Sequence, residues 1–183
     1  MPRKLKNIEL QRLNVDDFRT SPKQPVVVVL DNVRSMLNVG SVFRSCDAFR
    51  IEHLFLCGIT PTPPHRDITK SAIGAELAVS WTYDSSTLER ILTLKSQGYT
   101  CYAVEQTDDT ISLDSFDAPT DNKIAIVLGH EVDGVDQNVI DACNGCLEIP
   151  QYGTKHSLNI SVCAGIVLWE LAGRKNERIR NNE

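Results

Sequence analysis

The sequence lacks a long apolar run. None of its hydrophobic stretches approaches the roughly 18 residues that a membrane-spanning helix needs, and Met1–Gln24 has no apolar core of the kind found in secretory signals. Of the 183 residues, 42% are hydrophobic and 23% charged, a balance typical of a single soluble domain. We therefore expect one cytoplasmic domain that makes no membrane contact.

The cysteine spacing of a disulfide framework is also missing. Six cysteines would suit such a framework only in a small secreted chain, and most of them stand singly among apolar residues, as Cys46 and Cys101 do. Cys143 and Cys146 form a CxxC, which could be half of a zinc site or a redox pair. Because no second CxxC and no HxxxH follows, we expect unpaired thiols and no metal site.

Two nucleotide-binding fingerprints are absent. The sequence contains neither GxGxxG nor GxxxxGK[ST] in a loop that could bind a ligand, which argues against a dinucleotide site and against a P-loop. An α/β oxidoreductase with a nucleotide cofactor stays an alternative that a failure to bind NAD would exclude.

Basic charge is scarce in the middle of the chain and gathers at its ends. The net charge of −5 argues against a protein that coats nucleic acid, yet residues 1–23 carry six Lys or Arg against three acids, and residues 174–183 carry four against two. Such ends could hold a polyanion by phosphate contacts or could simply be solvated. We divide the chain into a basic extension at 1–24, a folded domain at 25–173 and a basic tail at 174–183.

Short segments rich in Val and Ile alternate with stretches of helical period. This pattern predicts an α/β fold, with a mostly parallel sheet flanked by helices. The predicted strands are 25–30, 53–57, 100–104, 124–128 and 146–149, and the predicted helices are 38–50, 86–98 and 158–172. Ligands of open parallel sheets bind beyond the carboxyl ends of the strands, so we expect the site among the loops 31–38, 58–66, 105–112, 129–135 and 150–157.

Two of these loops carry unusual clusters. In the first, from Asn38 to Arg44, the spacing alone makes Asn38 a helix N-cap and Arg44 a surface ion-pair partner. In the second, 128–135, two glycines and two acids directly follow a buried strand. Gly129 and Gly134 would let the backbone approach a ligand or adopt positive φ, and the density of acids favours a functional loop over a plain turn.

A third cluster, 149–161, joins a strand end, a glycine loop and a polar helix start. Ser157 could cap the helix, and Asn159 falls in its first turn, where free N–H groups bind anions or polar ligands. Capping explains one polar residue but not Ser157, Asn159 and Ser161 together.

The three clusters resemble the motifs of SpoU/TrmH-type RNA 2′-O-ribose methyltransferases of the SPOUT superfamily. They stand in the family's order and spacing, as N-x-G-x-x-x-R from Asn38, LGxExxGV from Leu128 and IPxxGxxxSLNxSV from Ile149. The resemblance covers residues 25–172.

The resemblance implies a deep trefoil knot near the C-terminus, a homodimer, and methyl transfer from S-adenosylmethionine to a ribose 2′-hydroxyl of tRNA or rRNA. The cofactor-binding residues that we expect, largely through backbone groups, are Glu105, Leu128, Gly129, Ile149, Gly153, Ser157 and Leu158. The catalytic and RNA-facing residues that we expect are Asn38, Arg44, Glu131, Ser157 and Asn159.

The sequence offers no obvious base for the ribose proton. The family's first-motif arginine has been cast in that role, but a guanidinium rarely gives up its proton. We interpret Arg44 instead as a phosphate clamp that also stabilises developing alkoxide charge. Ser157 and Asn159 would orient the nucleotide or the cofactor, and Glu131 would fix Asn38 or Arg44 by a charge-assisted hydrogen bond. Further phosphate contacts could come from His65, Arg66, Lys70, Lys155 and His156, unless these are only solvated.

Some features leave alternatives open. His130 stands in the second motif where the family often has a small residue. We expect no N-terminal RNA-binding module of the kind that some relatives carry, which leaves the RNA unspecified. A knotted RNA-binding module without transfer activity is the main alternative. The apolar last helix, with Leu168 and Trp169, offers a surface for a dimer, unless Trp169 closes the monomer core.

Overall fold

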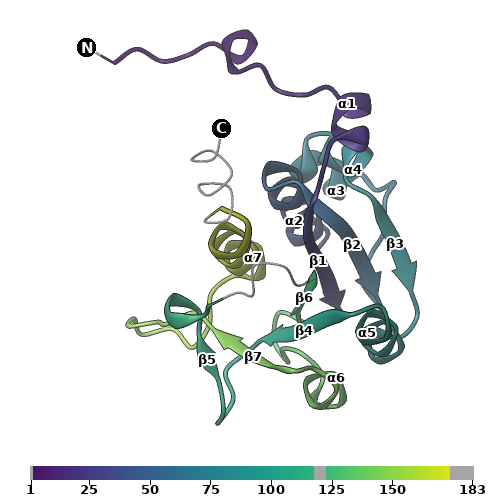
Figure 1. The fold of residues 1–183 in the computed structure, drawn as a ribbon, viewed down its shortest axis with the longest axis vertical. Helices are drawn as coiled ribbons and strands as arrows, with labels where there is room; N and C mark the ends of the chain where they lie inside the picture. The colour runs from purple at the N-terminus through teal and green to yellow at the C-terminus, as the bar shows by residue number, and fades with distance from the viewer. Residues whose placement is uncertain (1, 118–122, 174–183) are drawn as a thin grey trace.

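The computed structural model describes residues 2–117 and 123–173. Its centre is a sheet of seven parallel strands in the order β3-β2-β1-β6-β4-β7-β5 (Figure 1). The strands are β1 (Gln24–Asp31), β2 (Ile51–Cys57), β3 (Trp81–Asp84), β4 (Tyr99–Val104), β5 (Ile111–Ser112), β6 (Lys123–Leu128) and β7 (Gly145–Glu148). All their carboxyl ends therefore meet at one edge of the sheet.

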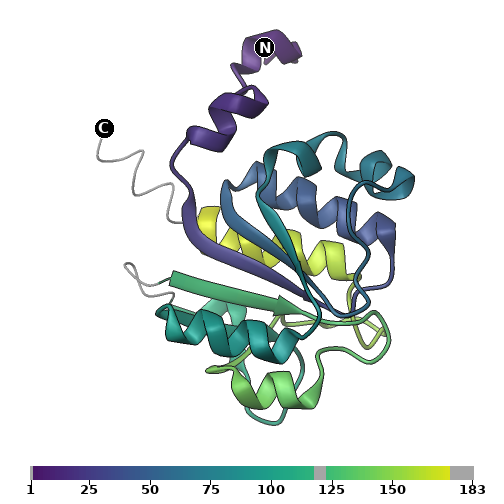
Figure 2. The same cartoon turned by 90° about the vertical axis from the view of Figure 1, so that its right-hand side faces the viewer.

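Helices cover both faces of this sheet. The helices are α1 (Val15–Thr20), α2 (Met36–Ala48), α3 (Arg66–Ala72), α4 (Ala75–Ala78), α5 (Thr87–Ser96), α6 (Gln137–Ala142) and α7 (Ile160–Leu168). Short 3₁₀ turns lie at Asn7–Leu10 and Leu113–Ser115, and a π-helical turn, Trp169–Gly173, continues α7. Figure 2 shows α2 and α7 on one side of the sheet and α5 and α6 on the other, so the fold has three layers.

Strand β1 is buried on both faces because it lies in the interior of this sandwich. Val26, Val28 and Leu30 pack in the cluster formed with α2, α3, α4 and α7, whereas Val27 and Val29 pack in the cluster formed with α5 and α6. The alternation follows from the period of two residues along a strand. This explains why the segment reads as an unbroken apolar run.

The α/β class, the parallel sheet and all five predicted strands are confirmed, each within two residues of its predicted bounds. The sequence interpretation missed β3, β5, α1, α3, α4 and α6, which are all short. The longest of them has seven residues, too few for a clear period of hydrophobicity.

Two predicted helix starts are wrong. Helix α2 begins at Met36, and its N-cap is Ser35, whose Oγ accepts a hydrogen bond from the Asn38 N–H at 3.3 Å. Helix α7 begins at Ile160, and its N-cap is Asn159 rather than Ser157. Asn38, the predicted cap of α2, lies inside the helix, so its side chain is available for another role. Ser157, the predicted cap of α7, lies before the helix.

The predicted basic extension at 1–24 leads into the sheet. It projects from the body in Figure 1, but Phe18 of α1 is buried in the core and Gln24 is the first residue of β1. The predicted basic tail at 174–183 lies outside the described residues. No helix within the described ranges is long and apolar enough to cross a membrane.

Candidate functional site

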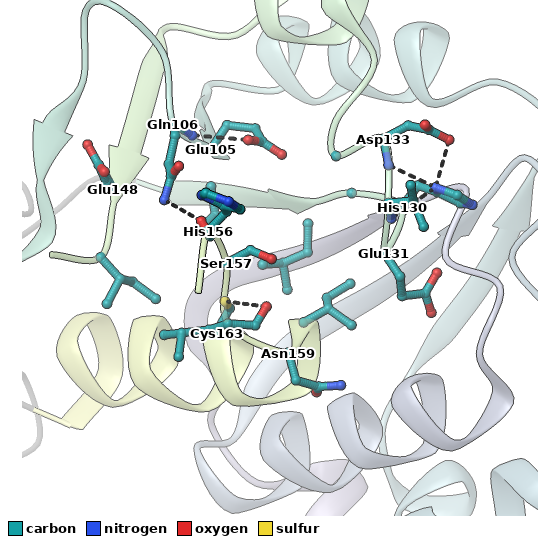
Figure 3. A pocket seen from close by; sticks show the side chains of 18 of the residues that line it. Glu105, Gln106, His130, Glu131, Asp133, Glu148, His156, Ser157, Asn159 and Cys163 are labelled. Atoms are coloured by element: carbon teal, nitrogen blue, oxygen red, sulfur yellow. Dashed lines mark hydrogen bonds and ion pairs between the residues drawn. The ribbon is translucent and has the colours of Figure 1, made fainter. Parts of the chain in front are cut away.

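A cavity of about 380 Å³ opens at the carboxyl ends of β4, β6 and β7 (Figure 3). Its walls come from the loops that follow these three strands and from the first turn of α7. The loops emerge side by side because β4 lies between β6 and β7 in the sheet. The second and third sequence clusters thus meet at one place, as expected from loops at the same edge of a parallel sheet.

The loop after β6 is closed on itself. His130 and Gly134 exchange two backbone hydrogen bonds, of 2.9 and 3.0 Å, and Gly134 has a positive φ of 71°. The Glu105 carboxylate at the end of β4 accepts a hydrogen bond from the Val135 N–H at 3.1 Å. A Cβ at Gly129 would overlap the backbone of Gly134 and Val135, so the loop can fold back this closely only with glycine at that position.

Glu131 projects from this loop onto the start of α2. Its carboxylate accepts hydrogen bonds from the Arg34 N–H at 3.1 Å, from the Ser35 N–H at 2.9 Å and from the Asn38 side-chain amide at 3.0 Å. Partial burial acts to raise the pKa of Glu131, but these hydrogen bonds outweigh it and lower the pKa below its ordinary value. The expected contact of Glu131 is therefore made with Asn38 and not with Arg44.

Asn159 connects the third cluster to the other two. Its Nδ2 donates to the Asn38 Oδ1 at 3.2 Å, and its Oδ1 accepts from the N–H of Ser161 at 2.9 Å and from the hydroxyl of Ser161 at 2.6 Å. Glu131, Asn38 and Asn159 thus form a chain of hydrogen bonds across all three clusters. Figure 3 shows Glu131 and Asn159 on the same side of the cavity.

The cavity lining is acidic. Four carboxylates, those of Glu105, Glu131, Asp133 and Glu148, lie among the described residues that line it, and these residues include no Lys or Arg. Such a lining favours a ligand that carries positive charge and disfavours one with phosphate groups.

Some lining residues were not singled out from the sequence. The Gln106 side-chain amide donates to the backbone carbonyl of His156 at 3.1 Å and so joins two walls of the cavity (Figure 3). The signal for Gln106 was its place in a predicted strand-end loop. His130 Nδ1 accepts from the Asp133 N–H at 3.1 Å, which helps to shape its own loop.

Most of the expected site residues line this cavity. These are Glu105, Leu128, Gly129, Glu131, Ile149, Ser157, Leu158 and Asn159. Asn38 reaches it through Glu131 and Asn159, whereas Gly153 lies in the loop after β7 but is not part of the lining.

Arg44 lies apart from the other expected residues. It borders a second cavity, of about 290 Å³, between α1, α2 and α4, together with Asp47. Arg44 is exposed. Within this chain, therefore, Arg44 is not brought to the cavity that the other motif residues line.

The six cysteines are free thiols. Burial is the main cause that raises the pKa of the Cys143 thiol to about 12, so this member of the CxxC is a poor nucleophile at neutral pH. Within 2–117 and 123–173, no three or more His, Cys, Asp or Glu side chains are placed to hold a metal ion.

A family model described as the SpoU rRNA Methylase family matches residues 25–169. The chain is 29% identical over 164 residues to the 23S rRNA (guanosine-2′-O-)-methyltransferase RlmB of Vibrio parahaemolyticus, covering 88% of this chain and 64% of that protein. It therefore spans less than two thirds of that relative's length. It is 27% identical over 164 residues to a tRNA (guanosine(18)-2′-O)-methyltransferase of Thermus thermophilus, covering 88% of this chain and 81% of that protein. Its fold is similar to that of an AdoMet-bound rRNA methyltransferase from Sinorhizobium meliloti, with a TM-score of 0.76 and 22% identity over 86% of this chain and 60% of the other.

The substitution Glu131→Gln tests the hydrogen bonds onto α2. An amide can keep the two donors at Oε1 but turns an N–H toward the Arg34 N–H, so we expect the free energy of unfolding at pH 7 to fall by about 1 kcal/mol. Because the pKa of Glu131 is lowered in the folded protein, its stabilising effect is full above the ordinary value of 4.5 and is lost as the pH falls through the lower folded value. Urea denaturation of both proteins should therefore show a difference at pH 7 that narrows below pH 4.5. A difference that stays constant down to pH 3 would contradict this role.

Proposed function

Because the chain belongs to the SpoU rRNA methylase family, we propose that it transfers a methyl group from S-adenosylmethionine to a ribose 2′-hydroxyl of tRNA or rRNA. The observation that carries the proposal is the acidic cavity at which the second and third motifs meet, with the first attached to it through Glu131 and Asn159.

The residues present fit S-adenosylmethionine. Its sulfonium and amino groups are cationic, which suits a lining with four carboxylates and no Lys or Arg among the described lining residues. Backbone groups of Leu128, Gly129, Ile149 and Leu158 would hold the adenosine part. Gly129 has no side chain to keep a ligand from its backbone. A dinucleotide such as NAD would instead bring a pyrophosphate into an acidic lining.

Loops 128–135 and 149–159 would form the trefoil knot that the resemblance implies. Support comes from their packing around one cavity, where the Gln106 amide of the loop after β4 also donates to the His156 carbonyl of the loop 149–159. A knot of this kind would restrict the conformations of both loops before a ligand binds, which preorganises the site. A cytoplasmic location would suit work on cellular tRNA or rRNA.

In the proposed reaction the 2′-oxygen attacks the sulfonium methyl in line, the C–S bond breaks as the O–C bond forms, and the hydroxyl proton leaves to a base or to water. The chain of Glu131, Asn38 and Asn159 would orient the nucleotide at the mouth of the cavity. Ser157 lines the cavity and would contact the ribose or the cofactor.

Arg44 would bind an RNA phosphate. Because it lies outside the cavity of its own chain, it would stabilise the charge that develops on the 2′-oxygen only at the cavity of a partner subunit. In support, its guanidinium is exposed and lies in a recess outside the acidic cavity, where a polyanion can approach. The basic ends of the chain would add phosphate contacts without base specificity.

We expect the protein to bind S-adenosylhomocysteine but not NAD in calorimetry, and to transfer labelled methyl groups from S-adenosylmethionine to RNA from cells that lack it. Mass mapping of the modified nucleotide would identify a ribose methyl and decide between tRNA and rRNA. The substitution Gly129→Val should weaken S-adenosylhomocysteine binding at least about tenfold, because a side chain there must displace the loop 129–135. Cofactor binding without any methyl incorporation would favour the inactive RNA-binding module instead.

Arg44→Ala should abolish turnover and leave the affinity for S-adenosylhomocysteine unchanged, because Arg44 lies outside the cofactor cavity. Arg44→Lys keeps the charge but loses the planar fork that holds two oxygens, so we expect it to lose at least about tenfold in rate. Single-turnover kinetics and calorimetry measure the two effects separately. Normal turnover in Arg44→Ala would remove Arg44 from the active site, and near wild-type turnover in Arg44→Lys would show that charge alone suffices.

The protein should be a homodimer that buries the outer face of α7. Val162, Ile166 and Trp169 recur at helical spacing and are 48%, 37% and 61% exposed, so Trp169 does not close the monomer core. Leu168, by contrast, is 1% exposed and belongs to the core, so the expectation that it lies on this surface is wrong.

Light scattering should show that the wild-type protein is a dimer at micromolar concentration. The variant Val162→Glu should be a monomer, and the control variant Leu92→Glu on α5 should remain a dimer. A monomeric wild-type protein would refute this assembly.

A further inference from the structure

A second polar cluster lies at the end of β1, outside the cavity lining. Asp31 is 1% exposed. Its Oδ1 accepts hydrogen bonds from the Thr87 hydroxyl at 2.5 Å and the Asn32 side-chain amide at 3.0 Å, and its Oδ2 accepts from the Asp136 N–H at 3.0 Å. A buried carboxylate at such a position is costly unless its hydrogen bonds are made, and here both oxygens have donors.

Asn32 extends this cluster to a third loop. Its Oδ1 accepts from the Ile59 N–H at 3.1 Å, and its Nδ2 also donates to the Asp136 carboxylate at 3.3 Å. Asn32 has a positive φ of 55°, and a Cβ at Gly58 would overlap its Oδ1. The loops that follow β1, β2 and β6 are thus joined through one side chain.

These contacts fix the far end of the loop that carries Glu131. Glu131 binds the start of α2, Glu105 holds the Val135 N–H, and Asp31 holds the Asp136 N–H directly after it. The loop 129–136 is therefore attached at three points, of which only the last lies outside the cavity lining.

We propose that Asp31 and Asn32 are positioning residues for methyl transfer, which set the loop 129–136 against the start of α2 and so place Glu131 relative to Asn38. The proposal rests on the proposed function for its catalytic consequence, whereas the attachment of the loop stands on the contacts alone. Neither residue is expected to touch the cofactor or the RNA.

The chemistry of the cluster requires a carboxylate at position 31. Donors face both oxygens. The Asp136 N–H can only donate, and the Asn32 amide could turn its oxygen toward Asp31 only by losing the hydrogen bond from the Ile59 N–H. An asparagine would therefore direct its own N–H₂ at a donor whichever way it is oriented. Asp31→Asn keeps the shape of the side chain and breaks at least one attachment.

The test compares Asp31→Asn and Asn32→Gly with the wild type in the full chain. Glycine tolerates the positive φ at position 32 and removes both loop contacts of the side chain, so this variant decides the question if Asp31→Asn does not fold. The control is Tyr99→Phe, which removes a 3.0 Å hydrogen bond to the Glu52 carboxylate at the opposite edge of the sheet. For each protein we would measure the melting temperature and the amide hydrogen exchange over residues 129–136 without ligand. We would also measure the affinity for S-adenosylhomocysteine, and kcat and KM for RNA.

In both test variants the amide hydrogens of residues 129–136 should exchange at least about tenfold faster than in the wild type. The kcat and the affinity for S-adenosylhomocysteine should each fall about tenfold, while KM for RNA should change little. Tyr99→Phe should lower the melting temperature while its exchange over 129–136 and its kcat remain those of the wild type. Unchanged exchange over 129–136 in both test variants would overturn the proposal, as would equal losses of kcat in the control. A wild-type protein that does not bind S-adenosylhomocysteine would refute the proposed function, and the exchange measurement would still decide whether Asp31 and Asn32 hold the loop.

Discussion

The carboxylate of Glu131 joins two segments that lie 96 residues apart in the chain, the loop after β6 and the start of α2. The contact is possible because β1 and β6 are neighbouring parallel strands, whose following loops leave the same edge side by side. Its negative charge also lies at the N-terminus of α2, where the helix dipole favours an acid. The orientation of Asn38, and through it the contact with Asn159, depends on this one side chain.

The acidic cavity and the proposed RNA substrate would impose opposite demands on the surface around the site. Carboxylates suit the proposed cationic cofactor, but they would repel the phosphates of an RNA that brought a ribose to the same place. The structure separates the two demands in space, since Arg44 lies in a recess of its own between α1, α2 and α4. Phosphates can then be bound at a distance from the carboxylates while only an uncharged ribose approaches them.

Much of this arrangement could be predicted from the sequence, and the failures have physical causes. Unbroken Val and Ile runs revealed the strands that are buried on both faces, and the family match confirms the resemblance carried by the three motifs. Strand β3 was missed because two of its four residues are exposed, which leaves no apolar pattern. The separate place of Arg44 could not be predicted, because spacing along a helix gives the face of a residue but not the neighbour which that face meets. The cluster around Asp31 escaped for the same reason, since the three donors to Asp31 come from three separate places in the chain.

The strand order also determines when the site can form as the chain folds. In the sheet order β3-β2-β1-β6-β4-β7-β5, strand β1 and its neighbour β6 are far apart in the sequence, since Val26 pairs with Ile124. Closing so long a loop costs conformational entropy before the contacts between β1 and β6 can offset that cost, and topologies of this kind fold slowly. Until β6 is inserted, the apolar edges of β1 and β4 have no partner, and an incomplete chain exposes them to other chains. The arrangement that brings distant loops to one cavity thus has a kinetic cost, since the molecule is most prone to aggregate while its central strand is still missing.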